Sequence, residues 1–290
     1  MNVEGRDGFN PKAIPGRIGV EISANLSRPL VPEHRALLQS LVHRHGLVLA
    51  RGQSLDPARH VQLVENLGPV PSGGHDGVSV ISNKVARESS GFAAEFARGT
   101  LAFHADDAFS PDPTRYISLH AVDVIDDASS TIFASAVAVL DDLPSELRRR
   151  IDGVDALHVF GRYVDRRNRL RSSETNDPHS FHPAILPHPV TGQPVLFVNY
   201  LMTDSLYGLS LEESDELLRR LFDHLYAAQN LYEHRWKKGD VLMWDNFLLQ
   251  HARGPVDEAK VGPRKLSRVI SVNRGFFETH PQFRVEFLGE

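Results

Sequence analysis

Short apolar or alternating runs, separated by turn residues, dominate the chain from about residue 78 onward. Such runs are typical of β-strands. Strands are expected at residues 78–81, 101–106, 116–122, 131–134, 194–198, 240–244 and 268–272. Their irregular spacing, with few helices between them, argues against a doubly wound parallel sheet. The pattern favours a mainly β barrel or sandwich of mostly antiparallel strands, with flanking helices packed outside it.

The helical pattern is confined to a few segments. Helices are predicted at residues 32–45 and 57–67, from about residue 144 onward, and at 211–226, with a short buried strand at 47–50. Asp56 can cap the second helix, and Gly46 and Gly68 can end the first two. In the last helix Ser210 and Glu213 have capping-box spacing, and leucines recur at helical period. We expect this leucine stripe to contact the core and not a cofactor.

Composition and charge narrow the class of protein. The chain has 290 residues, of which 41% are hydrophobic and 24% charged, as is ordinary for a globular protein. Its formal net charge of -5 gives no general attraction to nucleic acid or anionic membranes. No apolar run approaches the roughly 20 residues that span a bilayer, and the polar start lacks the apolar core of a signal peptide. We therefore expect a cytoplasmic protein that binds neither nucleic acid nor membranes. A homo-oligomer is our expectation for its assembly, which the composition does not determine.

The chain has no cysteine and 15 histidines. Without cysteine there is no disulfide, no thiolate nucleophile, no zinc ribbon and no cysteine-ligated iron–sulfur cluster. Any metal must therefore be bound by histidine, aspartate, glutamate or backbone oxygen.

Two polar segments far apart in the sequence have the residue types of an iron site. His104 and Asp106 are two residues apart in an expected strand, so both side chains point to one face. His251 follows a Trp-Asp-Asn segment that begins at Trp244. Two imidazoles and one carboxylate bind a ferrous ion on one side and leave its other positions open. The pattern therefore predicts a metal site made of His104, Asp106 and His251.

The His-x-Asp spacing alone is weak evidence, because about two His-x-acid triplets are expected by chance in a chain of this composition. The order of the parts strengthens it, since a threonine, a Trp-Asp-Asn-x4-His segment and an Arg-x3-Arg pair follow the triplet. The other histidines lack this context. Loop or capping roles are expected for His75, His158, His179, His182, His188 and His234.

The downstream residues suit a 2-oxo acid as co-substrate. Such an acid chelates two open iron positions through its 1-carboxylate and keto oxygen, and dioxygen takes the last. The far carboxylate of 2-oxoglutarate then needs a fixed positive charge, and arginine offers a planar pair of donors that keeps its proton. Arg264 is predicted to supply that charge, and the Thr131 hydroxyl one further hydrogen bond. Without the upstream motif, Thr131 fits an ordinary strand, and Arg264 and Arg268 fit an exposed basic pair.

Two polar segments are candidate lids over such a site, on their length and polarity. They are residues 83–100 and the arginine-rich residues 161–182. A nucleic-acid patch is an alternative for the second segment, but a solvated lid or connector is favoured in a chain of negative net charge.

A Phe-His-Ala-Asp segment at 103–106 and a Gly-Asp-x3-Trp-Asp-Asn-x4-His segment at 239–251 are the most specific motifs of the chain. Together with segments at 18–30, 45–53 and 182–199, they resemble the taurine dioxygenase / 2,4-dichlorophenoxyacetate dioxygenase (TauD/TfdA) family of Fe(II)- and 2-oxoglutarate-dependent oxygenases. The resemblance covers about residues 15–275. It implies a double-stranded β-helix, or jelly roll, in agreement with the strand pattern.

The resemblance also implies roles by position. The three metal ligands named above would bind Fe(II), Thr131 and Arg264 would contact 2-oxoglutarate, and dioxygen would be the other co-substrate. Arg268 would lie beside the co-substrate or bind an acidic group of the substrate. A single dioxygenase domain is expected over residues 1–290. The expected substrate-binding residues are Arg268, Asp107, Phe109, Asn199 and Met202.

The implied reaction oxidises, and most often hydroxylates, a C–H bond of a small molecule, with release of succinate and carbon dioxide. Asp107 stands where the family commonly has an apolar or small residue, and it favours a cationic group, whereas Arg268 favours an acid. We therefore expect an acidic or amino-acid-like substrate. Residues 71–77 contain His75 but no tyrosine, so they lack the His and Tyr pair that the taurine enzyme uses on its substrate, which argues against taurine.

Two other classes of protein stay open at this point. A metal-dependent hydrolase could use the same ligands on zinc to activate water, and it would need neither Thr131 nor Arg264. A β-rich binding protein would have a structural metal or none. Succinate release that depends on iron, oxygen and 2-oxoglutarate separates the oxygenase from the hydrolase.

Overall fold

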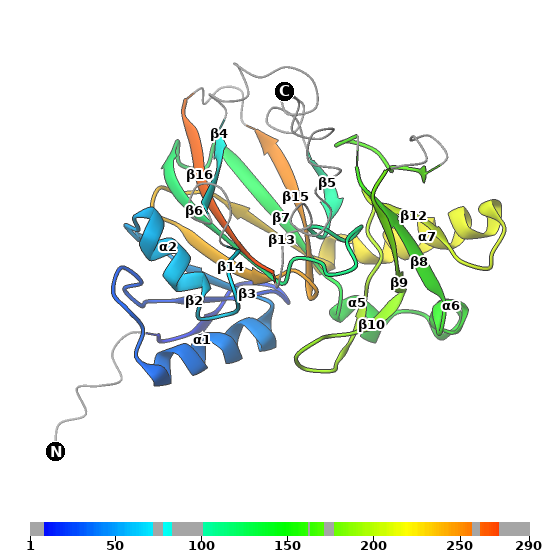
Figure 1. The fold of residues 1–290 in the computed structure, drawn as a ribbon, viewed down its shortest axis with the longest axis horizontal. Coiled ribbons are helices and arrows are strands. Elements are labelled where there is room, and N and C mark those ends of the chain that lie inside the picture. Colours follow the sequence, from blue (N-terminus) through cyan, green and yellow to red (C-terminus); the bar gives the residue numbers. More distant parts are fainter. Residues whose placement is uncertain are drawn as a thin grey trace.

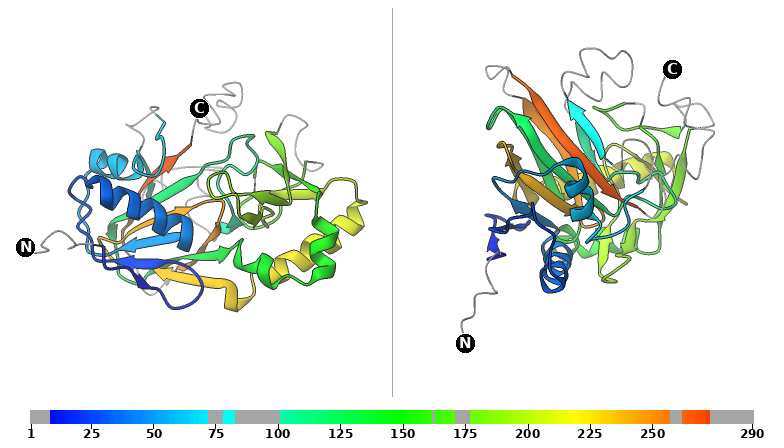
Figure 2. Two further views of the ribbon diagram at one scale, coloured as in Figure 1. Left: turned by 90° about the horizontal axis from the view of Figure 1, so that it is seen from below. Right: turned by 60° about the vertical axis from the view of Figure 1, so that its left-hand side comes forward.

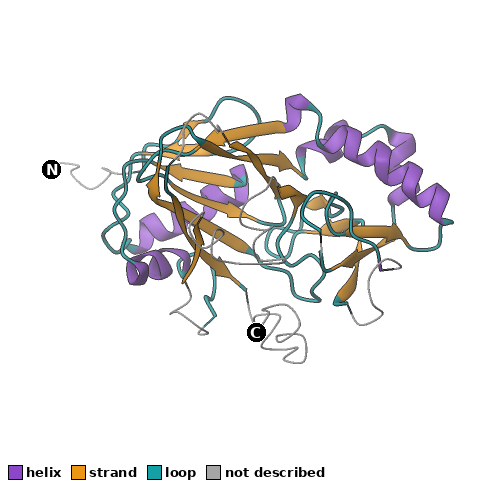
Figure 3. Cartoon of the chain, turned by 90° about the horizontal axis from the view of Figure 1, so that it is seen from above, coloured by secondary structure: helices purple, strands orange, loops and turns teal. Residues whose placement is uncertain are grey.

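β-strands make up most of the regular structure in the computed structural model, which describes residues 9–71, 78–82, 101–161, 163–170, 177–256 and 262–272. Figures 1 and 3 show the strands between two groups of helices, one at each end of the molecule. The helices are α1 (Pro32–His45), α2 (Pro57–Val64), α5 (Ala138–Asp142), α6 (Ser145–Ile151), α7 (Leu211–Leu225) and a 3-10 turn at Ala228–Asn230. No described helix is both long enough and apolar enough to span a membrane.

The described strands form four sheets. The seven-stranded sheet has the order β1 (Lys12–Ala13), β2 (Val20–Ile22), β3 (Leu47–Ala50), β14 (Val241–Asp245), β6 (Tyr116–Val124), β16 (Arg264–Ser271), β4 (Val78–Ser82). The four-stranded sheet has the order β13 (Leu231–Arg235), β7 (Ser129–Ser135), β15 (Leu249–Val256), β5 (Leu101–His104). The three-stranded sheet has the order β12 (Thr203–Leu206), β8 (Asp155–Val159), β9 (His179–Pro183). The two-stranded sheet pairs β10 (Ile185–Pro187) with β11 (Pro194–Leu196).

The two larger sheets enclose a common hydrophobic core, which confirms the predicted jelly roll. Leu119 of β6 and Trp244 of β14 come from one sheet, and Phe133 of β7 and Leu249 of β15 from the other. All but one of the strand pairs are antiparallel, the exception being β2 with β3. This arrangement places the inner faces of both sheets around the space where a ligand can bind.

The alternation of side chains along β3 places them in two different cores, so this strand of the seven-stranded sheet is buried on both faces. Leu47 and Leu49 belong to the core between the sheets, whereas Val48 and Ala50 pack with α1 and α2 on the outer face. Figure 2 shows these two helices beside that sheet. Full burial of one such leucine or valine stabilises the fold by about 1.5–3 kcal/mol.

Most predicted helix boundaries follow their end signals closely, but the predicted end of the second helix at Gly68 is wrong, because α2 stops at Val64 and residues 65–67 form a turn. Gly46 ends α1 in a left-handed conformation with φ 75°, and the Asp56 side chain accepts a hydrogen bond from Arg59 N at 2.7 Å. Ser210 and Glu213 form the predicted capping box of α7. The leucine stripe of α7 is buried against α5, α6 and β12, which confirms its role as core.

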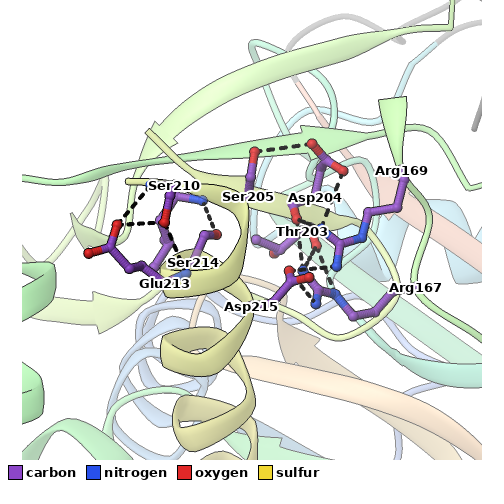
Figure 4. Close-up of polar contacts among 10 residues, drawn as sticks. Arg167, Arg169, Thr203, Asp204, Ser205, Ser210, Glu213, Ser214 and Asp215 are labelled. Carbon is purple, nitrogen blue, oxygen red and sulfur yellow. Dashed lines mark hydrogen bonds and ion pairs between the residues drawn. The ribbon is translucent and has the colours of Figure 1, made fainter. Parts of the chain in front are cut away.

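The described part of the arginine-rich segment lies against the start of α7. Arg167 and Arg169 both donate to Asp215 Oδ1, at 3.2 and 2.6 Å, and Arg167 Nη2 also donates to the carbonyl of Asp204 at 2.7 Å (Figure 4). Their side chains are 16% and 14% exposed. These arginines are therefore bound to protein groups, not freely solvated. The end of the segment, from His179, belongs to β9.

Candidate active site

The register of two neighbouring strands brings the predicted metal-binding histidines together. His104 ends β5, His251 lies on β15, and the two are directly opposite each other in the antiparallel pair. Opposite residues of such a pair point to the same face. Their ring centroids are 4.2 Å apart. Asp106 Oδ1 lies 3.2 Å from His104 Nε2 and 3.6 Å from His251 Nε2.

These distances suit a shared metal ion. One donor atom of each of the three side chains lies within 4.8 Å of the others. Two adjacent ligands about 2.1 Å from an ion lie about 3 Å apart, close to the observed separations. His104 Nδ1 lies 2.9 Å from the carbonyl oxygen of Ala102, so Nδ1–H donates there and the Nε2 lone pair faces the other ligands. Within the described residues, no other group of histidines and acids has this geometry.

The charges at this group favour the protonation states that a metal requires. Burial, together with the neighbouring His104, lowers the pKa of His251 to about 3, so its imidazole is neutral at neutral pH. Burial alone would raise the pKa of Asp106, but the guanidinium of Arg268 and the two imidazoles hold that pKa well below its usual range. Arg268 forms an ion pair with Asp106 Oδ2. The predicted Arg268 therefore lies directly beside the metal ligands.

A buried asparagine fixes the backbone of Asp106. Asn246 Oδ1 accepts from Asp106 N at 2.9 Å, and its Nδ2 donates to the carbonyls of Asp106 and Thr114 at 2.9 and 2.8 Å. The Asn246 residue is 1% exposed. Because the side chain holds both polar backbone groups of Asp106, it orients the carboxylate toward the histidines.

A cavity of about 490 Å³ opens beside the three ligands, between the two larger sheets. Phe109 and Phe160 form part of its wall as an edge-to-face pair, with ring centroids 4.9 Å apart. Its other lining residues come mainly from β4, β5, β6, β7, β14, β15 and β16. They are Ser79, Val80, Ile81, Ser82, Leu101, His104, Asp106, Asp107, Ile117, Leu119, Thr131, Gly161, Leu201, Met202, Trp244, His251, Arg253, Arg264 and Arg268.

The predicted co-substrate residues meet in this cavity. Thr131 Oγ1 accepts from the indole Nε1–H of Trp236 at 3.0 Å, which leaves the threonine proton free to donate to a ligand. Arg264 comes from the opposite sheet, and its Nε donates to Ser129 Oγ at 3.3 Å. Burial, and then the nearby charge of Arg253, lowers the pKa of Arg264 to about 9, so it is still a cation at neutral pH.

The predicted substrate residues do not all reach the cavity. Asp107, Phe109 and Met202 line it. The Asp107 carboxylate accepts from Thr114 Oγ1 at 2.6 Å, and burial and the adjacent Asp106 raise its pKa. Asn199 is not among the lining residues; its Oδ1 accepts from Met202 N at 2.8 Å. It therefore shapes the turn that presents Met202.

The expectation for the remaining histidines was mostly wrong. His158, His179, His182 and His234 lie on strands β8, β9 and β13, not in loops or at helix ends. The sequence does not reveal this because these strands mix polar and apolar residues without clear alternation. His188 does lie in a loop, where its Nε2–H donates to the buried Asp245 at 2.9 Å. His75 is outside the described residues.

Sequence reasoning missed four residues of the site: Asn246, Trp236, Arg253 and Phe160. Asn246 is part of the Trp-Asp-Asn motif, and its position there could have indicated that it belongs to the site. Arg253 lies two residues after His251, which in a strand puts it on the same face. Trp236 and Phe160 carry no local signal, because their roles depend on contacts with distant strands.

The chain matches a family model described as "Taurine catabolism dioxygenase TauD, TfdA family" over residues 10–270. Among curated proteins, it is 27% identical over 234 residues to the alpha-ketoglutarate-dependent 2,4-dichlorophenoxyacetate dioxygenase of Cupriavidus pinatubonensis, covering 74% of this chain and 80% of the relative. It is also 27% identical over 272 residues to the alpha-ketoglutarate-dependent sulfate ester dioxygenase of Pseudomonas putida, covering 88% and 87%. Alpha-ketoglutarate is another name for 2-oxoglutarate.

The fold is similar to solved structures as well. The crystal structure of AAD-2 in complex with Mn(II) and N-oxalylglycine superposes with a TM-score of 0.78 and 22% identity, covering 91% of this chain and 96% of that one. At 22% identity this structural similarity is evidence for the fold alone, and that fold agrees with the jelly roll described above.

Proposed function

Because the chain belongs to the TauD/TfdA family of Fe(II)- and 2-oxoglutarate-dependent dioxygenases, we propose that it hydroxylates a C–H bond of a small acidic or amino-acid-like molecule. Iron, 2-oxoglutarate and dioxygen are the cofactor and co-substrates of such a non-heme iron enzyme. Succinate and carbon dioxide are released with the oxidised product.

One observation supports this proposal above the others: the metal-binding group and a guanidinium–hydroxyl pair share one cavity. His104, Asp106 and His251 line it together with Thr131 and Arg264. A zinc hydrolase has no use for that pair, whereas a keto diacid bound to iron requires a partner for its far carboxylate. The relatives named above give no support to the hydrolase alternative.

Each group of the site has a distinct task in the proposed reaction. His104, Asp106 and His251 would hold Fe(II), and the bound iron supplies the activation of dioxygen. Arg264 and Thr131 bind and orient the far carboxylate of 2-oxoglutarate. Phe109, Met202 and the other apolar walls exclude water from the reacting C–H bond.

The substrate class is supported by the two charges nearest the metal ligands. Arg268 and Asp107 both line the cavity, so a substrate with an acidic group, an amino group or both can find a partner of opposite charge. N-oxalylglycine, which was bound in the AAD-2 crystal structure, has the two carboxylates and the 2-oxo group of 2-oxoglutarate, so it is a suitable ligand for binding studies on this chain.

The proposal is tested by measuring succinate formation while the supply of iron and of oxygen is controlled. The purified chain is incubated with Fe(II), 2-oxoglutarate and oxygen, and with amino acids, sulfonates and aryloxy acids in turn. We expect one group of compounds to stimulate succinate formation, with loss of the signal when iron or oxygen is withheld. Hydrolysis of a panel compound without 2-oxoglutarate would favour the hydrolase instead.

Replacing Arg264 with glutamine is expected to raise the KM for 2-oxoglutarate by about 10- to 100-fold, because a charged hydrogen bond to the far carboxylate is lost. The kcat at saturating 2-oxoglutarate should change much less. Steady-state kinetics at varied 2-oxoglutarate measure both constants. Arg235→Gln, an exposed arginine on β13, is the matched control. An unchanged KM in R264Q would remove this residue from the co-substrate site.

We also propose that residues 83–100 and 161–182 act as lids in a single domain that spans residues 1–290. Residues 83–100 lie outside the described chain. For the second segment, Phe160 and Gly161 line the cavity just before the arginines that bind Asp215. Movement of this segment would therefore change access to the cavity.

Asp215→Ala is expected to loosen the segment at residues 163–170, because Arg167 and Arg169 both lose a carboxylate partner and Arg169 keeps only its longer ion pair with Asp204, at 3.9 Å. The loss of unfolding free energy should be small, about 1 kcal/mol, since Asp215 is partly exposed. Hydrogen exchange should become faster in residues 163–170, and the KM for the substrate should change. Asp223→Ala, which breaks a fully surface pair on the same helix, should do neither.

Two further proposals concern location and assembly. We propose a cytoplasmic location and a homo-oligomeric assembly. Light scattering after size-exclusion chromatography measures the oligomeric state, and fractionation of cells measures the location.

A further inference from the structure

Arg253 points toward the cavity that holds the metal-binding group. On β15 it lies two residues after His251, and the β15–β7 register pairs His251 with Phe133 and Arg253 with Thr131. Residues two apart on a strand share a face, and so do residues directly opposite across an antiparallel pair. Arg253 is therefore on the same face as both a metal ligand and the threonine of the co-substrate site. It is also one of the residues that line the cavity.

A second guanidinium reaches the same end of the cavity from the opposite sheet. Arg264, on β16, donates to Ser129 Oγ, and Ser129 lies two residues before Thr131 on β7. Arg253 and Arg264 are close enough for the charge of Arg253 to lower the pKa of Arg264, after the larger effect of burial. Two cations thus gather around Thr131, in a partly buried place where like charges repel strongly.

We propose that Arg253 is a second arginine for the far carboxylate of 2-oxoglutarate, which it binds together with Arg264 and Thr131. The inference rests on the proposed function, because it assigns a further residue to the same co-substrate. An anionic carboxylate between the two guanidinium groups offsets their mutual repulsion. The site therefore selects a diacid over a 2-oxo acid that lacks the second carboxylate.

The test removes the carboxylate from the ligand and the arginine from the protein in turn. The ligands are 2-oxoglutarate and 2-oxopentanoate, which has a methyl group where 2-oxoglutarate has its far carboxylate. Binding of each to Mn(II)-loaded protein without oxygen is measured by calorimetry, for the wild type, R253Q and R253K. The quantity compared is the ratio of the two dissociation constants.

We expect the wild type to prefer 2-oxoglutarate, and R253Q to lose about 10-fold or more of that preference through weaker binding of 2-oxoglutarate alone. Binding of 2-oxopentanoate should stay within about 2-fold, because its contacts are to the metal. R253K should keep part of the preference. Arg235→Gln, on the exposed side of the same sheet, should keep all of it.

The outcomes separate this inference from the proposed function. If metal-loaded wild type binds neither ligand, the proposed function is wrong. If it prefers 2-oxoglutarate and R253Q keeps the full preference, only the role of Arg253 is wrong. Should R253Q not fold, a crystal structure of the wild type with Mn(II) and 2-oxoglutarate decides the matter. It must show an Arg253 nitrogen within about 3.2 Å of the far carboxylate.

Discussion

Asp106→Ala is expected to abolish stoichiometric iron binding and to lower succinate formation by more than about 100-fold. Loss of a residue that only supports a metal ligand typically costs about 10- to 100-fold, so loss of a direct ligand should exceed that range. Asp106 is also the one carboxylate that lies within 3.6 Å of both imidazoles in the described site. Without it the ion would have two neutral ligands and no compensating protein charge.

Metal analysis of protein purified without oxygen measures the first effect, and succinate formation at saturating 2-oxoglutarate measures the second. Asp223→Ala is the control, because this aspartate lies on the exposed face of α7 and pairs with Arg219. Full iron content in D106A, with unchanged turnover, would show that the ion is bound elsewhere.

Asn246→Ala is expected to weaken both the fold and the iron site. The change leaves the N–H and C=O of Asp106 and the C=O of Thr114 without their buried partner. The free energy of unfolding should fall by about 2–4 kcal/mol. Because the Asp106 backbone is then free to shift, iron affinity should fall by about 10- to 100-fold.

The control for this variant must lose stability without touching the site. Asn230→Ala fits, since Asn230 is also buried and its Nδ2 donates to the carbonyl of His224, outside the cavity. Urea denaturation of the metal-free proteins should show a loss in both variants, and iron titration a loss only in N246A. Equal iron affinity in the two would mean that Asn246 only stabilises the fold.

The sequence was sufficient for the parts of the fold that depend on local patterns. The helix ends at Gly46, Asp56 and Ser210 follow from conformational preference and capping, which act over a few residues. The buried strands β3 and β14 follow from continuous apolar runs. By contrast, β8, β9 and β13 carry histidines and other polar residues that are paired only through distant contacts, and so they were missed.

The residues of the site likewise fall into those that the sequence could predict and those that it could not. His104, Asp106 and His251 could be predicted because metal coordination restricts residue type and spacing. The ion pair of Arg268 with Asp106 could not, since it joins β16 to a loop after β5. Likewise Asn199 looked like a substrate residue, but its amide completes a turn. Which face of a strand reaches the cavity depends on register, and register is set by the whole sheet.

The place of β16 in its sheet affects how the protein can form during synthesis on the ribosome. It is the last strand that the structure describes, yet it lies between β6 and β4 and pairs with both. A nascent chain that ends before Arg264 therefore leaves one edge of β6 unpaired, and it lacks Arg264 and Arg268 of the site. Open strand edges invite pairing with other chains. Until this strand has been made, the growing polypeptide therefore exposes an edge of β6 that other chains could pair with.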